Sequence, residues 1–144
     1  MARFKKDLGS RYFVVAKGEN GSKPAYLEFR DASLADVSAH RAALARAQQG
    51  NQGTVLDDEH RIKTATVISA FVRARVVAAH GFEVEDESGQ VRELTWEADA
   101  DLILELIPEG LLDLFRRTID SLNFPGSIAE FENASIAGSR VLPN

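Results

Sequence analysis

The sequence predicts a mainly helical α+β domain: an N-terminal β-hairpin followed by a small helical bundle that includes a second short hairpin. Two observations predict this fold. Two short runs near the N-terminus are rich in β-branched and aromatic residues, as strands are. Later segments repeat apolar residues every three or four positions, which is the period of an amphipathic helix. We expect residues 1–125 to form one compact domain and residues 126–144 to form a loosely ordered tail.

The first hairpin is predicted from residues 11–17 and 25–30. Residues 25–30 alternate apolar and polar side chains, which is the two-residue period of a strand. The segment between the two runs is dense in turn-forming residues, including Gly18, Gly21 and Pro24. A segment of this length favours a longer loop over a two-residue turn.

Two helices are predicted after this hairpin. The first begins after Ser33, a residue type that caps helix N-termini, and runs to Gln49. Residues 48–54 form a polar, glycine-punctuated linker, which we expect to be the most mobile loop. The next helix has acidic residues at 57–59 in its first turn and an apolar stripe that continues to residue 79. We expect this long helix to be the spine of the fold or an inter-subunit helix.

A second hairpin and two further helices are predicted after Gly81, which we expect to cap the long helix at its C-terminus. Residues 82–86 and 91–94 can pair across a four-residue turn. Thr95 is the expected cap of the next helix, and a proline separates that helix from the last one, at about 109–122. We expect five side chains to be buried together in the core: Ile68, Phe71, Trp96, Leu106 and Phe115.

Composition argues against several classes of chemistry. The chain has no cysteine, which excludes disulfides, thiolate catalysis and cysteine–zinc sites. Its three histidines, His40, His60 and His80, are 20 residues apart, whereas zinc ligands on one helix are three or four apart. We expect each histidine to be solvated or at a helix end. No nucleophile elbow is present. Acidic residues are numerous, so a pair of carboxylates for hydrolysis stays open, although no pair is singled out. The profile is that of a docking surface, and we expect no catalytic residue, no metal site, no cofactor and no enzyme activity.

The charge is distributed unevenly along the chain. Residues 81–123 contain 12 of the 22 acidic residues and three arginines, whereas residues 61–80 contain four basic residues and no acidic one. Two interpretations stay open. The acidic and basic segments can pack together within one fold, or the acidic segment can form a face for a basic partner or a second copy. The basic stretches lack the density of a phosphate-binding surface, so we do not expect nucleic acid as a partner.

The last predicted helix carries more apolar residues than one core face needs. We interpret the excess as a surface for a partner helix or another copy of the chain. The alternative is that both of its apolar stripes are buried within the monomer. Trp96, the only tryptophan, is either a core anchor or an interface residue. The candidate partner-binding residues are Trp96, Leu111, Leu112, Phe115, Ile119 and Leu122.

The layout of the chain resembles the tail assembly chaperones of long-tailed bacteriophages. The likeness lies in the hairpin and helix start at 12–37 (YFVVAK…AYLEFRDASLADV) and in residues 76–122. There, a glycine–aromatic pair, an acidic turn, a threonine-capped acidic helix, a proline and a final amphipathic helix follow one another. The linker at 48–54 and the tail after Pro125 are not covered.

This resemblance implies a protein that is not an enzyme and that binds and solubilises the tape measure protein during tail morphogenesis. Such chaperones often self-associate, and they work in the host cytoplasm. No apolar run is long enough for a signal-peptide core or a transmembrane helix, so we expect no membrane as a partner. The alternatives are a structural head–tail connector or minor tail protein of a phage particle and, as a third class, an enzyme or its regulatory subunit.

Overall fold

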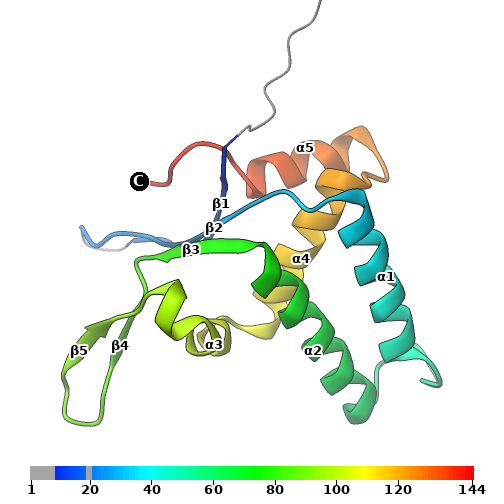
Figure 1. Ribbon diagram of the computed structural model, residues 1–144, viewed down its shortest axis with the longest axis horizontal. Helices are drawn as coiled ribbons and strands as arrows, with labels where there is room; N and C mark the ends of the chain where they lie inside the picture. Colours follow the sequence, from blue (N-terminus) through cyan, green and yellow to red (C-terminus); the bar gives the residue numbers. More distant parts are fainter. Residues whose placement is uncertain (1–8, 19–20) are drawn as a thin grey trace, which may run out of the picture.

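A computed structural model describes residues 9–18 and 21–144, and it confirms the mainly helical α+β fold (Figure 1). A three-stranded sheet lies beside a group of helices, and a two-stranded hairpin projects from the body. Along the chain the elements are β1 (Arg11–Ala16), β2 (Ala25–Phe29), α1 (Leu34–Gln48), α2 (Asp58–Arg75), β3 (Val76–His80), β4 (Glu83–Glu85), β5 (Val91–Glu93), α3 (Trp96–Leu106), α4 (Glu109–Asn123) and α5 (Ile128–Ala137).

Both predicted hairpins are present. β1 pairs antiparallel with β2, with Phe13 opposite Leu27, and β4 pairs antiparallel with β5, with Val84 opposite Arg92. The loop of the first hairpin includes residues 19–20, which lie outside the described residues. The alternation of side chains in β1 and β2 places Phe13, Leu27 and Phe29 in the core. The sheet is therefore covered by helices on one face.

The predicted long helix is wrong in its last part. α2 ends at Arg75, and Val76–His80 is strand β3, which pairs with β2 and places Leu27 opposite Ala79. The β-branched Val76 and Val77 suit a strand, and this pairing satisfies the backbone groups of the second edge of β2. Gly81 is not a helix cap: with φ of 78° it turns the chain out of β3 toward β4.

The predicted helix starts are confirmed by their hydrogen bonds. The Ser33 hydroxyl accepts from the Asp36 N–H, and the Asp36 carboxylate accepts from the Ser33 N–H, so the two residues form a capping box. The Thr95 hydroxyl accepts from the Ala98 N–H in the same way at α3. In the linker at 48–54, the Asn51 side chain donates to the Gly53 carbonyl and accepts from the Asp57 N–H.

The core centres on three phenylalanines from β1, β2 and α4. The Phe115 ring makes edge contacts with Phe13 and Phe29, at centroid distances of 4.5 and 4.8 Å. Of the five predicted core residues, Ile68, Phe71 and Phe115 are buried, and Trp96 is partly buried against the core. Leu106 is 46% exposed, so its predicted burial is wrong. The buried face of α3 is formed by Ala100, Ile103 and the following Ile107, which leaves Leu106 on its flank.

The segment after Pro125 is packed against the domain, which differs from the expected loose tail. It forms the ten-residue helix α5, capped by the Ser127 hydroxyl, which accepts from the Glu130 N–H. Beyond α5, the Tyr12 N–H donates to the Ser139 carbonyl at 2.7 Å. Arg140 donates to the Asp31 carboxylate at 3.0 Å. These long-range contacts connect the tail to β1 and to the segment after β2.

Candidate partner-binding surface

The apolar residues of α4 that the sequence suggested for partner binding lie mostly in the core. Leu112, Phe115 and Ile119 are buried, with Ile119 fully so. Leu111 and Leu122 are half-buried and pack against the same core, as does Trp96 on α3. This placement favours the alternative interpretation, in which both apolar stripes of α4 are buried within the monomer.

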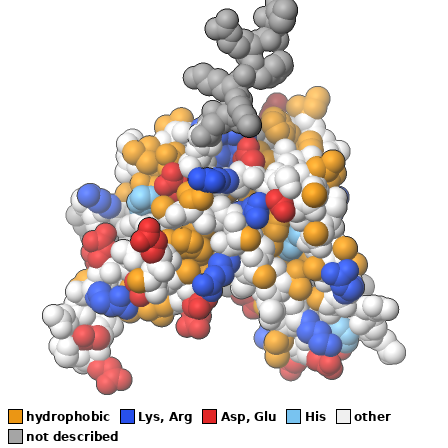
Figure 2. Space-filling view, in the orientation of Figure 1, with side chains coloured by type: hydrophobic (Ala, Val, Ile, Leu, Met, Phe, Trp, Pro, Cys, Tyr) orange, Lys and Arg blue, Asp and Glu red, His pale blue; other side chains and the backbone are white. Residues whose placement is uncertain are grey.

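Exposed apolar side chains instead gather on α5 and beside it. Ile128 is 80% exposed and Ile136 is 76% exposed, while Phe131 and Leu114 of the neighbouring α4 are each 43% exposed. Figure 2 shows hydrophobic side chains at the end of the molecule where Figure 1 places α5. We call these four residues, Leu114, Ile128, Phe131 and Ile136, the α5 surface. The segment that follows α5 adds exposed Val141 and Leu142.

α5 is held to the domain by its small and polar residues. Ala134 is 6% exposed and faces the domain. The Glu130 carboxylate accepts from the Ser121 hydroxyl at 2.7 Å and from the Gly126 N–H at 3.1 Å. The large apolar residues are therefore left on the outer side of the helix. This is the reverse of an ordinary surface helix, whose apolar stripe faces the core.

A groove of about 530 Å³ runs between α4 and α5 next to this surface. Leu114 lines it from α4, and Ala129, Asn133 and Ala137 line it from α5. Arg117 also lines it, and its guanidinium pairs with the Asp113 carboxylate at 3.1 Å. Small side chains on the α5 side let another helix approach closely, so the groove and the α5 surface together suit an amphipathic helix.

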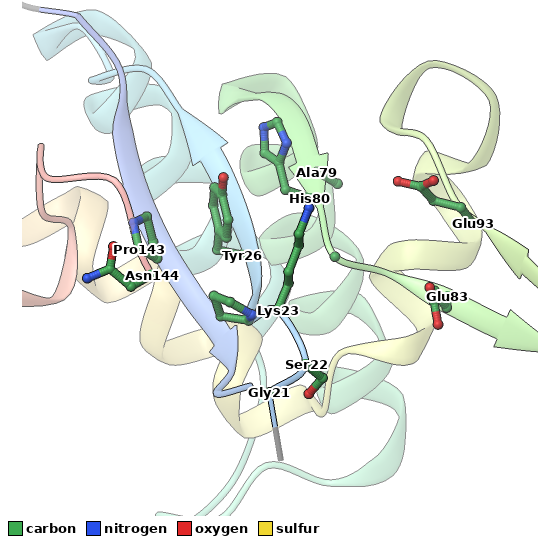
Figure 3. Close-up of a pocket in the computed structure, with 12 residues that line it drawn as sticks. Gly21, Ser22, Lys23, Tyr26, Ala79, His80, Glu83, Glu93, Pro143 and Asn144 are labelled. Carbon is green, nitrogen blue, oxygen red and sulfur yellow. The ribbon is translucent and has the colours of Figure 1, made fainter. Parts of the chain in front are cut away.

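A second hollow, of about 900 Å³, lies at the end of the sheet where β3 leads into β4 (Figure 3). His80 ends β3 and not a helix, but it is exposed, as the solvated alternative predicts. Its ring stacks on Tyr26 with centroids 4.8 Å apart, and its Nε2 is 3.3 Å from the Glu28 carboxylate. Lys23 reaches into the hollow from one side, and Glu83 lies on the other. The polar groups surround the hollow instead of converging on one point, so the arrangement offers hydrogen bonds rather than a reaction centre.

His40 is buried, contrary to the expectation that the histidines are solvated. It is 5% exposed and stacks flat on Phe71 with ring centroids 4.0 Å apart. The pKa of His40 is lowered to about 4, chiefly by burial and in addition by the nearby Arg116 and Arg41 guanidinium groups. The sequence did hold a signal, because His40 lies at helical spacing between Val37 and Leu44 on the inner side of α1.

His60 is at a helix end, as predicted, and joins the linker to α2. Its Nδ1 is 2.6 Å from the Asp57 carboxylate, and its Nε2 is 2.9 Å from the Gln49 carbonyl. The hydrogen bond with Asp57 raises the pKa of His60. Across residues 9–18 and 21–144, no group of three His, Cys, Asp or Glu side chains is placed to hold a metal ion.

Some charged segments pack against each other within the fold, and others are exposed and available to a partner, so each of the two interpretations of the charge pattern applies to part of the chain. Arg73 of α2 pairs with Asp101 of α3, and Arg75 pairs with Asp36 of α1, so part of the basic segment packs against acids within the fold. The carboxylates of Glu83 and Glu85 lie on the projecting β4–β5 hairpin and are exposed. This hairpin keeps a negative face available to a partner.

Comparison with known proteins does not identify a relative: no family model matches the chain, and neither a curated protein nor a solved structure does. In the part of the chain that the structure describes, none of the helices combines the length and the apolarity that a membrane span requires. The proposal below therefore depends on the α5 surface and on the resemblance in sequence layout.

Proposed function

We propose that this protein is a tail assembly chaperone of a long-tailed bacteriophage that binds and solubilises the tape measure protein in the host cytoplasm. In this proposal it is not an enzyme. It binds an amphipathic helix of its partner through the α5 surface and also self-associates. The supporting observation is the exposure of large apolar residues on α5: Ile128 is 80%, Ile136 76% and Phe131 43% exposed, although the helix is held to the domain through Glu130.

The chemistry of this surface suits a long helical client. An amphipathic helix buries its apolar face in a groove through side chains spaced three or four residues apart. Ile128 and Phe131, three residues apart, and the groove lined by Leu114 offer the complementary spacing. A client that exposes such stripes along its length aggregates when it is free, and covering the stripes removes that hazard.

The acidic side chains on the rest of the chain support the same role. The exposed carboxylates of the β4–β5 hairpin and the net charge of −5 keep a complex with an apolar client soluble. They also select against acidic partners, because like charges at an interface are unfavourable. Trp96 and the apolar residues of α4 act in this proposal as the support beneath the surface, since they pack in the core.

Co-expression tests the proposal. The natural client candidate is the product of a very long, coiled-coil-rich reading frame beside the gene. We expect this product to be insoluble when expressed alone and soluble, in a complex that co-purifies with this protein, when the two are expressed together. A client that stays insoluble with the folded protein present would contradict the proposal. A stable ring formed by this protein alone, without affinity for the client, would favour a head–tail connector.

A further inference from the structure

The groove between α1, α2 and α4 is a separate site, because the residues of α4 that line it are not those that line the groove beside α5. These three helices lie together in Figure 1, and the groove between them encloses about 570 Å³. This volume is within the range of small-molecule sites. We infer that this groove binds an aliphatic carboxylate. The residues that the argument uses are Leu44, Val55, Leu56, Thr64, Ile68 and Arg116.

The apolar wall of the groove is preformed. Leu44 of α1 and Ile68 of α2 form one part of it, and Val55 in the linker, 81% exposed, forms its rim. The linker is fixed in place because the Asn51 amide donates to the Val55 carbonyl at 3.1 Å and the Asn51 carbonyl oxygen accepts from the Asp57 N–H at 2.9 Å. Val55 is exposed on a hydrogen-bonded loop beside the groove, so a hydrocarbon chain bound there would bury its apolar surface, which is favourable.

Two residues that line the groove each carry a buried polar atom with no hydrogen-bond partner within the described residues: the Thr64 hydroxyl and the Arg116 Nε. Thr64 is 8% exposed. Other threonines in these helices bond the carbonyl four residues earlier: the Thr66 hydroxyl donates to the Ile62 carbonyl, and the Thr118 hydroxyl donates to the Leu114 carbonyl. Unpartnered buried polar groups are uncommon and costly, so a ligand acceptor that reaches these two atoms would be stabilised by them.

The start of α4 supplies further donors to the same groove. Pro108 at the N-cap position has no side chain that can cap the helix, and the Gly110 N–H has no partner in the described chain. A helix N-terminus of this kind favours an anion. Arg61 of α2, which makes no ion pair with a described residue, also lines the groove.

Two acids line the groove, and their positions matter for the charge of the ligand. The Asp113 carboxylate is already used, because one oxygen accepts from Arg116 at 2.6 Å and the other pairs with Arg117 at 3.1 Å. Glu109 is exposed in the first turn of α4. The unfilled positions next to Thr64 and Arg116 are therefore mainly donors. They match an acceptor, and a carboxylate fits them with its hydrocarbon part against Leu44 and Ile68.

Titration of the full chain with decanoate, followed by amide NMR, tests this site. We expect saturable binding of one decanoate per chain, with the largest shift changes at Val55, Thr64 and Gly110. Decyltrimethylammonium, which has the same chain and a positive head group, is the matched control and is expected not to bind there. The absence of saturable shifts in the groove, or equal binding of the cation, would overturn the inference.

Two substitutions separate the site from the fold. Thr64→Val keeps the shape of the side chain and removes an unpartnered hydroxyl, so we expect an unchanged or higher melting temperature and about tenfold weaker decanoate binding. Val55→Glu places a negative charge on the rim and is expected to abolish binding, whereas Val91→Glu, at an exposed valine of the β4–β5 hairpin, is expected to leave it unchanged. Decanoate affinity that is equal in the wild type, Thr64→Val and Val55→Glu would overturn the site.

Discussion

Helices α4 and α5 follow each other along the chain and pack together, yet they use their apolar residues in opposite ways. In α4, Phe115 and Ile119 point into the core and are almost fully buried. In α5, Phe131 is 43% exposed and Ile136 is 76% exposed. The number of apolar residues in a helix therefore does not predict which side of that helix packs against the domain.

The inner side chains of the two helices explain the difference. α4 lies against the sheet, where Phe13 and Phe29 offer a broad apolar partner to Phe115. α5 meets α4 through Ala134 and Glu130, whose carboxylate bonds Ser121. Small residues and one satisfied carboxylate allow close docking there, and the large apolar residues remain outside.

The largest effect on the free energy of unfolding is expected for the substitution of Ile119 in α4, compared with the same substitution of Ile136 in α5. Ile119→Glu places a charge in a fully buried site without a partner, and we expect it to unfold the protein, with a loss of more than about 4 kcal/mol. The same change at Ile136 is expected to move the free energy of unfolding by less than about 0.5 kcal/mol. Urea titrations of both variants make the comparison. A folded Ile119→Glu variant with the urea midpoint of the wild type would contradict the placement of this face of α4 in the core.

Truncation of Phe115 in α4 and of Phe131 in α5 to alanine compares the same two helices with a milder change. Phe115→Ala is expected to cost about 3–5 kcal/mol, because it opens a cavity between β1, β2 and α4. Phe131→Ala leaves no enclosed cavity, and we expect a loss below about 1 kcal/mol. Equal losses in guanidinium titrations would show that α5 is as much a part of the core as α4.

Acid is expected to lower the free energy of unfolding through His40, a core residue that packs on Phe71 near Arg116 of α4. Its pKa is about 4 in the fold and 6.5 in the unfolded chain. Because the folded-state pKa is lowered, the stabilisation is complete above pH 6.5 and is lost as the pH falls toward 4. We expect a loss of about 2 kcal/mol between pH 7 and pH 5.

The control for this prediction is His40→Phe, which keeps a ring on Phe71 and cannot take up a proton. The hydrogen bond of His60 with Asp57 acts in the opposite direction, since its raised pKa stabilises the fold at lower pH. The difference between the wild type and His40→Phe across this pH range therefore isolates His40. An equal pH dependence in both proteins would show that His40 is not the group that titrates.

A small effect is also expected at the polar anchor of α5, Glu130. Glu130→Gln keeps the shape of the side chain and weakens its two hydrogen bonds, so we expect a loss of about 1 kcal/mol. Hydrogen exchange is expected to rise in α5 while that of α4 stays unchanged. Unchanged exchange in α5 would show that its inner apolar contacts alone hold it.

The parts of the fold that follow local rules are predictable from the sequence. Both hairpins follow from strand patterns and turn residues, and the starts of α1 and α3 follow from Ser33 and Thr95. Strand β3 was missed because Val76–His80 continues the apolar stripe of α2, and only the free edge of β2 turns it into a strand.

The candidate surface was less predictable for a related reason. The stripes of α4 show that its residues are apolar, but their burial depends on Phe13 and Phe29 more than 80 residues away. The orientation of α5 depends on the contact between Glu130 and Ser121, which helical periodicity does not predict. The burial of His40 does not follow from its residue type, because histidine is not typically a core residue, although His40 occupies an inner position of α1.

The central claim is that α5 presents a partner surface on a domain that does not need it for folding. The most direct measurement is co-purification of the client with the double variant Ile128→Glu, Ile136→Glu. The control is Ile62→Glu, at an isoleucine of α2 that is 65% exposed. We predict that the double variant loses the client while its melting temperature stays within a few degrees of the wild type, and that Ile62→Glu keeps the client. Full retention of the client by the folded double variant would contradict the claim.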